Sequence, residues 1–357
     1  MEAVDNWSAQ IVKSVTRPFR EVSKGYTSFA ENDVLLAKIT PCMENGKCAI
    51  ARGLRDRVGF GSTEFHVLRA SKHVLPEWLF YFWRLPETRR NAERSMTGTA
   101  GQKRVPSSHL ERIKIPLPDL SEQKRIAGLM EQADWLRRTR RYALELSDTF
   151  LSAAFLELFG DPRKTTARWH AEQLENVGTL DRGRSKHRPR NAPHLYGGSY
   201  PFIQTGDVAN AEGYIRAHTQ TYSEEGLKQS KLWAAGTLCV TIAANIGKTA
   251  ILTYPACFPD SIVGFIAGER VRIEFVQFWL QFLQETLERT APEVAQKNIN
   301  LEILRELRCP VPPLHLQQEF AALVERHELL HASQRESLRQ TDHLFQSLLH
   351  GAFSCNV

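Results

Sequence analysis

The sequence predicts an α+β protein in which two mixed α/β domains in tandem are separated and followed by two long helices that pair as an antiparallel coiled coil. Three observations lead to this prediction. The chain repeats itself, because Gln102-Lys103 matches Gln296-Lys297 and the same offset then holds toward the C-terminus. A proline-rich junction ends the globular part of each copy, and a long stretch without proline follows it. Short strand-like runs and aromatic-rich amphipathic runs fill the globular parts.

Length and composition limit the class of protein. A chain of 357 residues can hold two or three domains, and 42% hydrophobic with 24% charged residues is typical of a globular protein. The longest uncharged stretch is shorter than the roughly 18 to 20 apolar residues that span a bilayer, and Glu2 and Asp5 do not suit a secretory leader. We therefore expect a cytoplasmic protein with no membrane contact. The formal charge of +6 is mildly basic and identifies no partner by itself.

The repeat and the junctions set the domain boundaries. We expect a first domain over residues 1–117, a first helix over 118–160, a second domain over 161–312 and a second helix over 313–357. Residues 34–39 and 237–242 are strand-like, and residues 78–83 and 275–283 form helices whose aromatic side chains lie in the core. The cysteines contain no C-x-x-C pair, so we interpret them as core thiols: Cys42, Cys48, Cys239, Cys257, Cys309 and Cys355.

The two long helices carry imperfect apolar seams. Asp119 and Glu122 are spaced as an N-cap and its N3 partner. The predicted seam of the first helix is Ile126, Leu129, Ala133, Leu136, Ala143, Phe150 and Ala154, interrupted by Arg140 and Ser147. That of the second is Phe320, Leu323, Leu330, Leu344 and Leu348, interrupted by His327, Gln334, Ser337 and Thr341. Because each apolar stripe can be buried against the other, we favour pairing of the two helices over two separate surface helices.

Two short segments resemble catalytic motifs but lack residues or spacing that those motifs require. Gly247-Lys248-Thr249 resembles the end of a phosphate loop, but Ile242 stands where that loop requires glycine. Asp119 and Glu122 lie one helical turn apart at a helix start, which favours capping over a metal-dependent nuclease site. The sequence therefore predicts no catalytic residue and no metal ligand.

The sharpest chemical feature is the basic loop, residues 181–190. Its cations alternate with other residues, which places them on one side of an extended strand: Arg182, Arg184, Lys186, Arg188 and Arg190. Arginine binds phosphates and guanine edges bidentately, so the loop is suited to nucleic acid, although a solvated loop is the alternative.

These residues together resemble a known family. The motifs that carry the resemblance are Tyr200-Pro-Phe-Ile-Gln-Thr-Gly-Asp207, the run from Gly236 to Lys248, and the repeated junctions Ile115-Pro-Leu-Pro-Asp-Leu-Ser-Glu-Gln123 and Cys309-Pro-Val-Pro-Pro-Leu-His-Leu-Gln317. In this order they are similar to the DNA-specificity (S) subunit of type I restriction-modification enzymes, over nearly the whole chain.

The resemblance implies two target-recognition domains, each reading one half of a bipartite site on double-stranded DNA. It also implies that the helices set the spacing and dock methyltransferase (M) subunits, and that restriction/translocase (R) subunits join them. S-adenosylmethionine, ATP and Mg are then expected in the partner subunits, with no cofactor and no catalysis in this chain. The candidate DNA contacts are the five cations of the basic loop with Gln204, Asn245, Lys248, Gln296 and Lys297, and in the first domain Lys47, Gln102, Lys103 and Arg104.

The two copies are unequal. Residues 169–235 precede the strand opening at Gly236, whereas only residues 1–32 precede the equivalent Asp33. The first domain is therefore expected to be shortened at its N-terminal side, through a start codon assigned too late, a truncated gene or genuine divergence of the domain, and to read its half-site poorly. The alternative function is a protein-interaction scaffold in which the helices act and the globular domains no longer read DNA.

Overall fold

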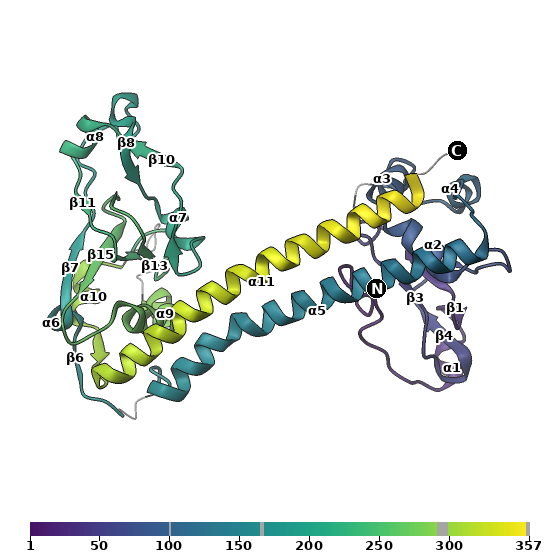
Figure 1. Ribbon diagram of the computed structural model, residues 1–357, viewed down its shortest axis with the longest axis horizontal. Helices are drawn as coiled ribbons and strands as arrows, with labels where there is room; N and C mark the ends of the chain where they lie inside the picture. Colours follow the sequence, from purple (N-terminus) through teal and green to yellow (C-terminus); the bar gives the residue numbers. More distant parts are fainter. Residues whose placement is uncertain (100, 165–167, 291–298, 355–357) are drawn as a thin grey trace. The chain divides into compact units, whose positions relative to one another are not determined.

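The computed structural model describes residues 1–99, 101–164, 168–290 and 299–354 (Figure 1). The chain forms two compact units: unit 1 comprises Met1–Glu145 with Ala332–Val357, and unit 2 comprises Leu146–His331. Each unit contains β-sheets and helices, which confirms the α+β class. Within the described residues, no helix combines the length and the apolar character needed to cross a membrane.

Unit 1 contains a three-stranded antiparallel sheet of order β3-β2-β5 and a two-stranded sheet of β1 and β4. The short elements of this unit are α1 (Phe19–Val22), β1 (Thr27–Ala30), β2 (Val34–Ala37), β3 (Cys48–Ile50), β4 (Val58–Gly61), β5 (Phe65–Leu68), α2 (Pro76–Arg84), α3 (Pro86–Arg94) and α4 (Ser107–Arg112).

Unit 2 contains a five-stranded sheet of order β7-β15-β12-β13-β9, a four-stranded sheet of order β10-β8-β14-β11 and a β16-β6 pair. The strands are β6 (Ala171–Gln173), β7 (Gly178–Arg182), β8 (Tyr196–Phe202), β9 (Tyr214–Ile215), β10 (Gln220–Tyr222), β11 (Leu232–Trp233), β12 (Leu238–Thr241), β13 (Thr249–Leu252), β14 (Ala256–Cys257), β15 (Ile262–Ala267) and β16 (Arg308–Pro310). The helices are α6 (Leu174–Val177), α7 (Thr205–Ala209), α8 (Glu224–Lys228), α9 (Ile273–Thr290) and α10 (Leu301–Glu306).

The central strands of the two units pair in the same register, which confirms the internal repeat. Val34 of β2 faces Ile50 and Leu68, and its counterpart Leu238 of β12 faces Ile251 and Phe265. The two strand-like runs of the sequence are these two central strands, which the structure makes slightly shorter than predicted.

Unit 2 has strands without a counterpart in the described part of unit 1. In unit 2, β7 and β9 flank the three repeated strands, and β8 and β10 extend the sheet of β11 and β14. In unit 1 the equivalent sheets stop at three and two strands. The difference in length between the two sequence copies therefore corresponds to strands at the edges of these sheets.

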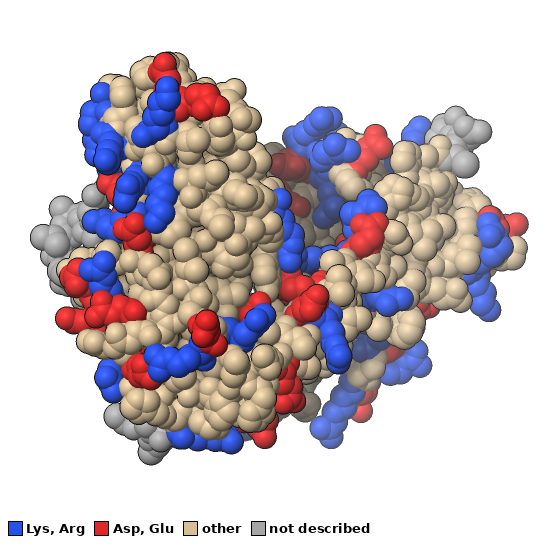
Figure 2. Space-filling model, turned by 60° about the vertical axis from the view of Figure 1, so that its left-hand side comes forward, with Lys and Arg blue, Asp and Glu red and all other residues tan. Residues whose placement is uncertain are grey.

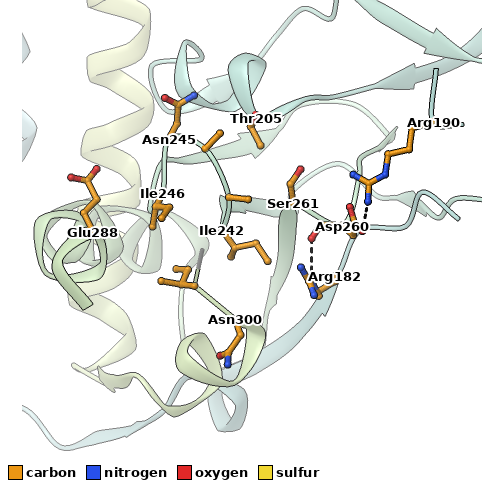
Figure 3. A pocket seen from close by; sticks show the side chains of 13 residues that line it. Arg182, Arg190, Thr205, Ile242, Asn245, Ile246, Asp260, Ser261, Glu288 and Asn300 are labelled. Carbon is orange, nitrogen blue, oxygen red and sulfur yellow. Dashed lines mark hydrogen bonds and ion pairs between the residues drawn. The ribbon is translucent and has the colours of Figure 1, made fainter. Parts of the chain in front are cut away.

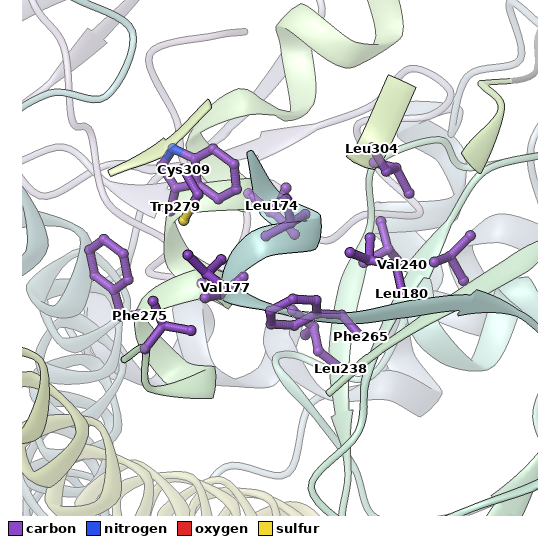
Figure 4. Close-up of a cluster of buried hydrophobic side chains, with 14 of the residues drawn as sticks. Leu174, Val177, Leu180, Leu238, Val240, Phe265, Phe275, Trp279, Leu304 and Cys309 are labelled. Atoms are coloured by element: carbon purple, nitrogen blue, oxygen red, sulfur yellow. The ribbon is translucent and has the colours of Figure 1, made fainter. Parts of the chain in front are cut away.

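The predicted aromatic helices lie in the cores of the units. Trp78 and Trp83 of α2 are buried, as are Phe275 and Trp279 of α9. Figure 4 shows side chains of α9 packed with residues of the five-stranded sheet such as Leu238, in the largest buried cluster of unit 2. This confirms the core assignment.

Four cysteines meet the prediction of core thiols: Cys48, Cys239, Cys257 and Cys309 are buried and free. Burial in apolar surroundings raises the pKa of these thiols. Cys42 meets the prediction only in part, because it lies in the loop after β2 and is half-buried, with its side chain packed against a core cluster of unit 1. Cys355 lies outside the described residues.

The long helices are α5 (Leu120–Phe159) and α11 (Leu314–Ser354), with 40 and 41 residues. Each begins in one unit and ends in the other, so within each unit the start of one helix packs on the end of the other in antiparallel sense. In unit 1, Met130 of α5 packs in one cluster with Phe345 of α11, and in unit 2 Phe155 of α5 packs against Phe320 of α11. The predicted pairing of the helices is confirmed.

The predicted seam is only partly correct. Four predicted members are largely exposed: Leu129, Phe150, Leu330 and Leu344. Several buried positions are instead their neighbours, including Met130, Leu151 and Phe345, because the strict 3,4 spacing drifts against a 3.6-residue helix. The middle is polar as predicted, since the His327 Nε2 lies 3.0 Å from the Ser147 Oγ. Arg140, however, is exposed, and the buried charges are Asp134 and Arg137.

A buried glutamine fixes the start of each long helix. Gln317 Nε2 donates to the carbonyls of Pro312 and Arg270, at 2.8 and 3.1 Å, and its Oε1 accepts from Arg272 N at 2.8 Å. Gln123 repeats these bonds in unit 1, where its partners are the carbonyls of Pro118 and His73 and the amide of Leu75. Both side chains are fully buried, so each joins the proline junction to the loop that precedes the aromatic helix.

Candidate nucleic-acid interface

The basic loop leaves the five-stranded sheet at the end of β7. The amide of Gly183 donates to the carbonyl of Ile262 at 2.9 Å and that of Arg184 to the carbonyl of Phe258 at 3.1 Å, so the chain stays extended beyond the strand. A side chain at Gly183 would lie 2.3 Å from the carbonyl oxygen of Pro259, which explains the glycine. Gly183 and Ser185 point inward, and the cations between and beside them point outward.

The period-two prediction holds only for the first three cations. Residues 187–189 bend, and the Arg188 guanidinium turns back to donate to the carbonyls of Ser185 and His187, at 2.7 and 2.8 Å. The interpretation that all five cations form one row is therefore wrong, because the backbone leaves the extended conformation after Lys186. All five remain exposed.

Two aspartates partly neutralise the cations. Asp260 accepts from Arg190 at 2.7 Å through its carboxylate, and its backbone carbonyl accepts from Arg182 at 3.0 Å. Asp181 accepts from Lys231 at 3.0 Å, with Arg184 at 3.8 Å. Burial alone would raise the pKa of Asp181, but the hydrogen bond and charge of Lys231 hold that pKa below its ordinary value. Figure 2 shows basic side chains gathered along the upper left edge of the nearer unit, with a few acidic ones among them.

A hollow of about 950 Å³ lies beside this loop (Figure 3). It brings together three of the predicted contacts, Arg182, Arg190 and Asn245, although they are far apart in the sequence. The other lining residues are Thr205, Ile242, Ala243, Ala244, Ile246, Asp260, Ser261, Glu288, Ile299 and Asn300. The hollow thus offers guanidinium donors, amide groups and carboxylate acceptors, which are the groups that read base edges in a DNA groove.

The loop that carries Asn245 has an unusual backbone. Ala244 and Asn245 have φ angles of 47° and 49°, in the left-handed region that asparagine tolerates and alanine disfavours. The Thr241 hydroxyl donates to the carbonyl of Asn245, which holds the loop. Such strain away from glycine is typical of positions where a loop is shaped for a ligand.

Gln204 lies at the edge of the same region. Its backbone amide donates to the carboxylate of Asp207 in a capping box at the start of α7, with an N to Oδ2 distance of 2.8 Å. Its side-chain amide donates to Gln220 at 2.6 Å, and both glutamines are exposed. The next residue, Thr205, lines the hollow.

The two lysines at glycine turns occupy equivalent places, as the repeat predicts. The carbonyl of Lys47 accepts from Ala37 N and that of Lys248 from Thr241 N, each at 3.0 Å. Gly46 and Gly247 before them have φ angles of 72° and 75°. The Lys248 side chain is exposed, whereas the Lys47 ammonium donates to the carbonyl of Met1 at 3.2 Å.

The remaining candidates of unit 1 adjoin the same turn, since the carbonyl of Lys103 accepts from Thr40 N at 3.0 Å. Gln102 and Lys103 are exposed. Arg104 is bound bidentately by Glu64, and this hydrogen bonding holds the pKa of the Glu64 carboxyl below its ordinary value. The equivalent pair of unit 2, Gln296 and Lys297, lies outside the described residues.

Of the acidic pair at the first junction, Asp119 caps the helix as predicted, whereas the Glu122 side chain binds Arg125. Asp119 Oδ1 accepts from Glu122 N at 2.8 Å, and the Glu122 carboxylate is bound by Arg125 at 2.7 Å. Across the described ranges, no group of three or more His, Cys, Asp or Glu side chains is arranged to hold a metal.

Sequence reasoning missed several residues of the hollow. Asp260, Ser261, Glu288 and Asn300 come from three separate segments, and no local pattern places them beside the basic loop. Thr205 follows Gln204 directly and was within reach of the sequence argument.

Comparison with known proteins gives one consistent family. A family model described as the type I restriction modification DNA specificity domain matches residues 8–145 and 167–340. The chain is 45% identical over 134 residues to the type I restriction enzyme EcoAI specificity subunit of Escherichia coli, covering 36% of this chain and 23% of that protein. It is 23% identical over 304 residues to the putative MjaX specificity subunit of Methanocaldococcus jannaschii, covering 81% of this chain and 70% of that protein. The matched part is thus under a quarter of the Escherichia coli relative's length.

Two solved structures share the fold. One, described as showing complex assembly and conformational transition of the type I R-M system, is 22% identical with a TM-score of 0.59, covering 99% of this chain and 89% of that chain. The other is a type I restriction-modification S subunit from M. genitalium, 14% identical with a TM-score of 0.60, covering 93% of this chain and 85% of that chain.

Proposed function

Because the chain belongs to the type I restriction modification DNA specificity family, we propose that it is the subunit that reads the DNA sequence for a type I restriction-modification complex in the cytoplasm. Each unit contacts one half of a bipartite site on double-stranded DNA. The family is non-catalytic, so methylation and cleavage belong to methyltransferase and restriction subunits, which carry S-adenosylmethionine, ATP and Mg.

The observation that carries this proposal is the convergence of Arg182, Arg190 and Asn245 on one hollow at the edge of the basic loop. Arginine fits guanine and asparagine fits adenine through paired hydrogen bonds. The exposed Lys186 and Lys248 supply charge for the phosphates, which positions the protein without reading the sequence.

In this proposal the helices set the distance between the half-sites and dock the methyltransferase subunits. The 40 residues of α5 extend about 60 Å at 1.5 Å per residue, the length of roughly 18 base-pair steps of 3.4 Å. Trp135 and Tyr142 of α5 are more than half exposed, and such aromatic side chains are frequent anchors of protein interfaces.

The two half-sites are read unequally in this proposal. Unit 2 holds the basic loop and the hollow, whereas unit 1 offers Lys47, Gln102 and Lys103 at one turn, and its Arg104 is engaged by Glu64. We expect methylation mapping in cells with the complete complex to show a stringent half-site for unit 2 and a relaxed one for unit 1. Equal stringency at both would contradict this part.

The main experiment titrates labelled duplexes with the purified chain at two salt concentrations. Specific DNA should bind with a steep salt dependence, and Lys248→Ala should reduce the slope of log affinity against log salt by about 0.9, the value for one phosphate contact. Arg190→Ala should cost about 1–3 kcal/mol of discrimination at one base pair.

Arg339→Ala is the matched control, because Arg339 is exposed, carries one positive charge and is paired with Glu336 on α11. It should leave affinity and salt slope unchanged. If Lys248→Ala and Arg190→Ala behave like this control, the interface is wrong; if no duplex binds in a salt-dependent way, a protein-interaction scaffold is the better account.

A further inference from the structure

Asp260 lies at the tip of a tight turn between β14 and β15. The amide of Ile262 donates to the carbonyl of Pro259 at 3.1 Å, which closes the turn. The basic loop is hydrogen-bonded to one side of this turn. On the other side, the amide of Ile242 donates to the carbonyl of Ser261 at 3.0 Å. The backbone around Asp260 is therefore held from two sides of the hollow.

Asp260 binds two arginines of the basic loop at once (Figure 3). Its carboxylate accepts from the Arg190 Nη2 at 2.7 Å, and its backbone carbonyl accepts from the Arg182 Nε at 3.0 Å. The loop bends between these two arginines, so its own backbone does not align their side chains. Because one residue holds both guanidinium groups, Asp260 determines how they lie relative to each other.

The two arginines keep hydrogen-bond donors for a ligand. Among the described residues, the Nη1 and Nη2 groups of Arg182 and the Nε and Nη1 groups of Arg190 make no hydrogen bond. Both arginines are exposed and line the hollow. A guanidinium held at one edge presents a fixed pair of N–H donors at another, and the O6 and N7 atoms of guanine accept such a pair.

The charge of Asp260 argues against simple phosphate binding at this place. Its side chain is 39% exposed, and its negative charge offsets the positive charge of Arg190. Each cation that meets a phosphate strengthens binding to any duplex, so an acid here weakens binding that is independent of sequence. An acid that orders an arginine before the DNA arrives instead favours a base edge, because less side-chain freedom is lost on binding.

We propose that Asp260 is a positioning residue for sequence recognition by unit 2, which holds Arg190 and Arg182 in the arrangement that binds guanine in the major groove. Because this role requires DNA reading by unit 2, it rests on the proposed function. Asp260 acts on the DNA only through the two arginines. It lowers the affinity of the hollow for unrelated DNA and raises the ratio between the affinities for the target and for other sequences.

The test selects duplexes from a randomised pool with the purified full chain, and then measures affinity for the selected duplex and its single base-pair variants. Asp260→Ala removes the carboxylate and leaves the backbone carbonyl that holds Arg182. It should lose about tenfold in discrimination at the base pairs where Arg190→Ala loses it. Its affinity for an unrelated duplex should stay equal or rise, whereas damage to the fold would lower the affinity for all duplexes alike.

Two further variants show whether Asp260 acts through Arg190. Asp260→Asn keeps one oxygen that can accept from Arg190, so it should retain part of the discrimination. In the Arg190→Ala background, Asp260→Ala should cause no further loss, whereas two independent effects would multiply. Glu269→Gln is the charge-matched control, because Glu269 is an exposed acid of unit 2 that does not line the hollow. It should discriminate like the unaltered chain.

The results separate this role from the proposed function. If the unaltered chain selects a sequence and Arg190→Ala relaxes it while Asp260→Ala does not, Asp260 has no positioning role and the proposed function stands. If the unaltered chain selects no sequence, both are wrong. The positioning role is also overturned if Arg190→Ala leaves the selected sequence unchanged, if Asp260→Ala weakens all duplexes alike, or if the losses from the two substitutions multiply.

Discussion

Replacing Gln317 with alanine should destabilise unit 2 strongly, because this buried amide makes three hydrogen bonds to backbone groups around the start of α11. Without it, the carbonyls of Pro312 and Arg270 and the amide of Arg272 lose their side-chain partner. A buried polar group left unpaired costs about 1–3 kcal/mol, and partial relaxation with entry of water leaves a total of roughly 3 kcal/mol. For a unit of this size, that corresponds to a fall in melting temperature of about 6–12 °C.

The assay is calorimetric unfolding of the full chain, with hydrogen exchange at the amides of β12 to assign the transition to unit 2. Gln318→Ala is the matched control, because Gln318 is the next residue of the same helix and is exposed. It should change the free energy of unfolding by less than about 0.5 kcal/mol. Gln317→Glu tests the hydrogen bonds themselves, since a carboxylate can accept from Arg272 but cannot donate to the two carbonyls. If Gln317→Ala and Gln318→Ala unfold at the same temperature, the hydrogen bonds of Gln317 do not stabilise the start of α11.

Three further predictions follow from contacts in the two units. Gly183→Ala should displace the basic loop and weaken DNA binding at least tenfold, because the added carbon would clash with the Pro259 carbonyl. Gly206→Ala, with open space around the added carbon, is the control and should bind normally in the same duplex titration. Asp134→Ala should cost unit 1 about 3–5 kcal/mol in chemical unfolding, because it leaves the buried Arg84 without its carboxylate and Arg137 with Asp342 at 3.6 Å in place of Asp134 at 2.6 Å. Glu131→Ala, at an exposed position, should cost little, and equal values for the two variants would contradict the role of Asp134. The hydrogen bond from Arg69 holds the pKa of Asp33 below 3.8, so its stabilising effect is full above that pH and is lost as the pH falls through the folded-state pKa. Acid unfolding of unit 1 should therefore shift to higher pH in Arg69→Ala, and an unchanged midpoint would refute the assignment.

The sequence contained enough information for the repeated framework. Strands β2 and β12 stand out because an apolar run buried on both faces leaves no room for polar residues, and the starts of α5 and α11 follow from proline and capping residues. These are local signals, which is why they could be read without coordinates.

The buried residues of the helix seam and the residues that line the hollow could be identified only from the structure. Asp134 and Arg137 are buried where the predicted seam would place apolar residues. They neutralise each other, and the Arg137 guanidinium also donates to the carbonyl of Trp7, near the start of the chain. The rim of the hollow joins β7, the turn at Asn245, the loop at Asp260 and the segment at Asn300. Such a site depends on strand order, and Arg188 shows that even an alternating charge pattern fails once the backbone bends.

The sharing of the long helices has a consequence for synthesis on the ribosome. The core of unit 1 includes Phe345 and Leu349, so its last side chains emerge after the whole of unit 2. All residues of unit 2, by contrast, are available once His331 is made. At roughly 5–20 residues per second, about 10–40 s pass between the synthesis of the first part of unit 1 and that of Phe353. During this time Trp78 and Phe82 lack the ring of Phe353 that packs on them in the folded unit. The usual order of domain maturation along a nascent chain is thereby reversed, and the first domain to be translated is the last to close.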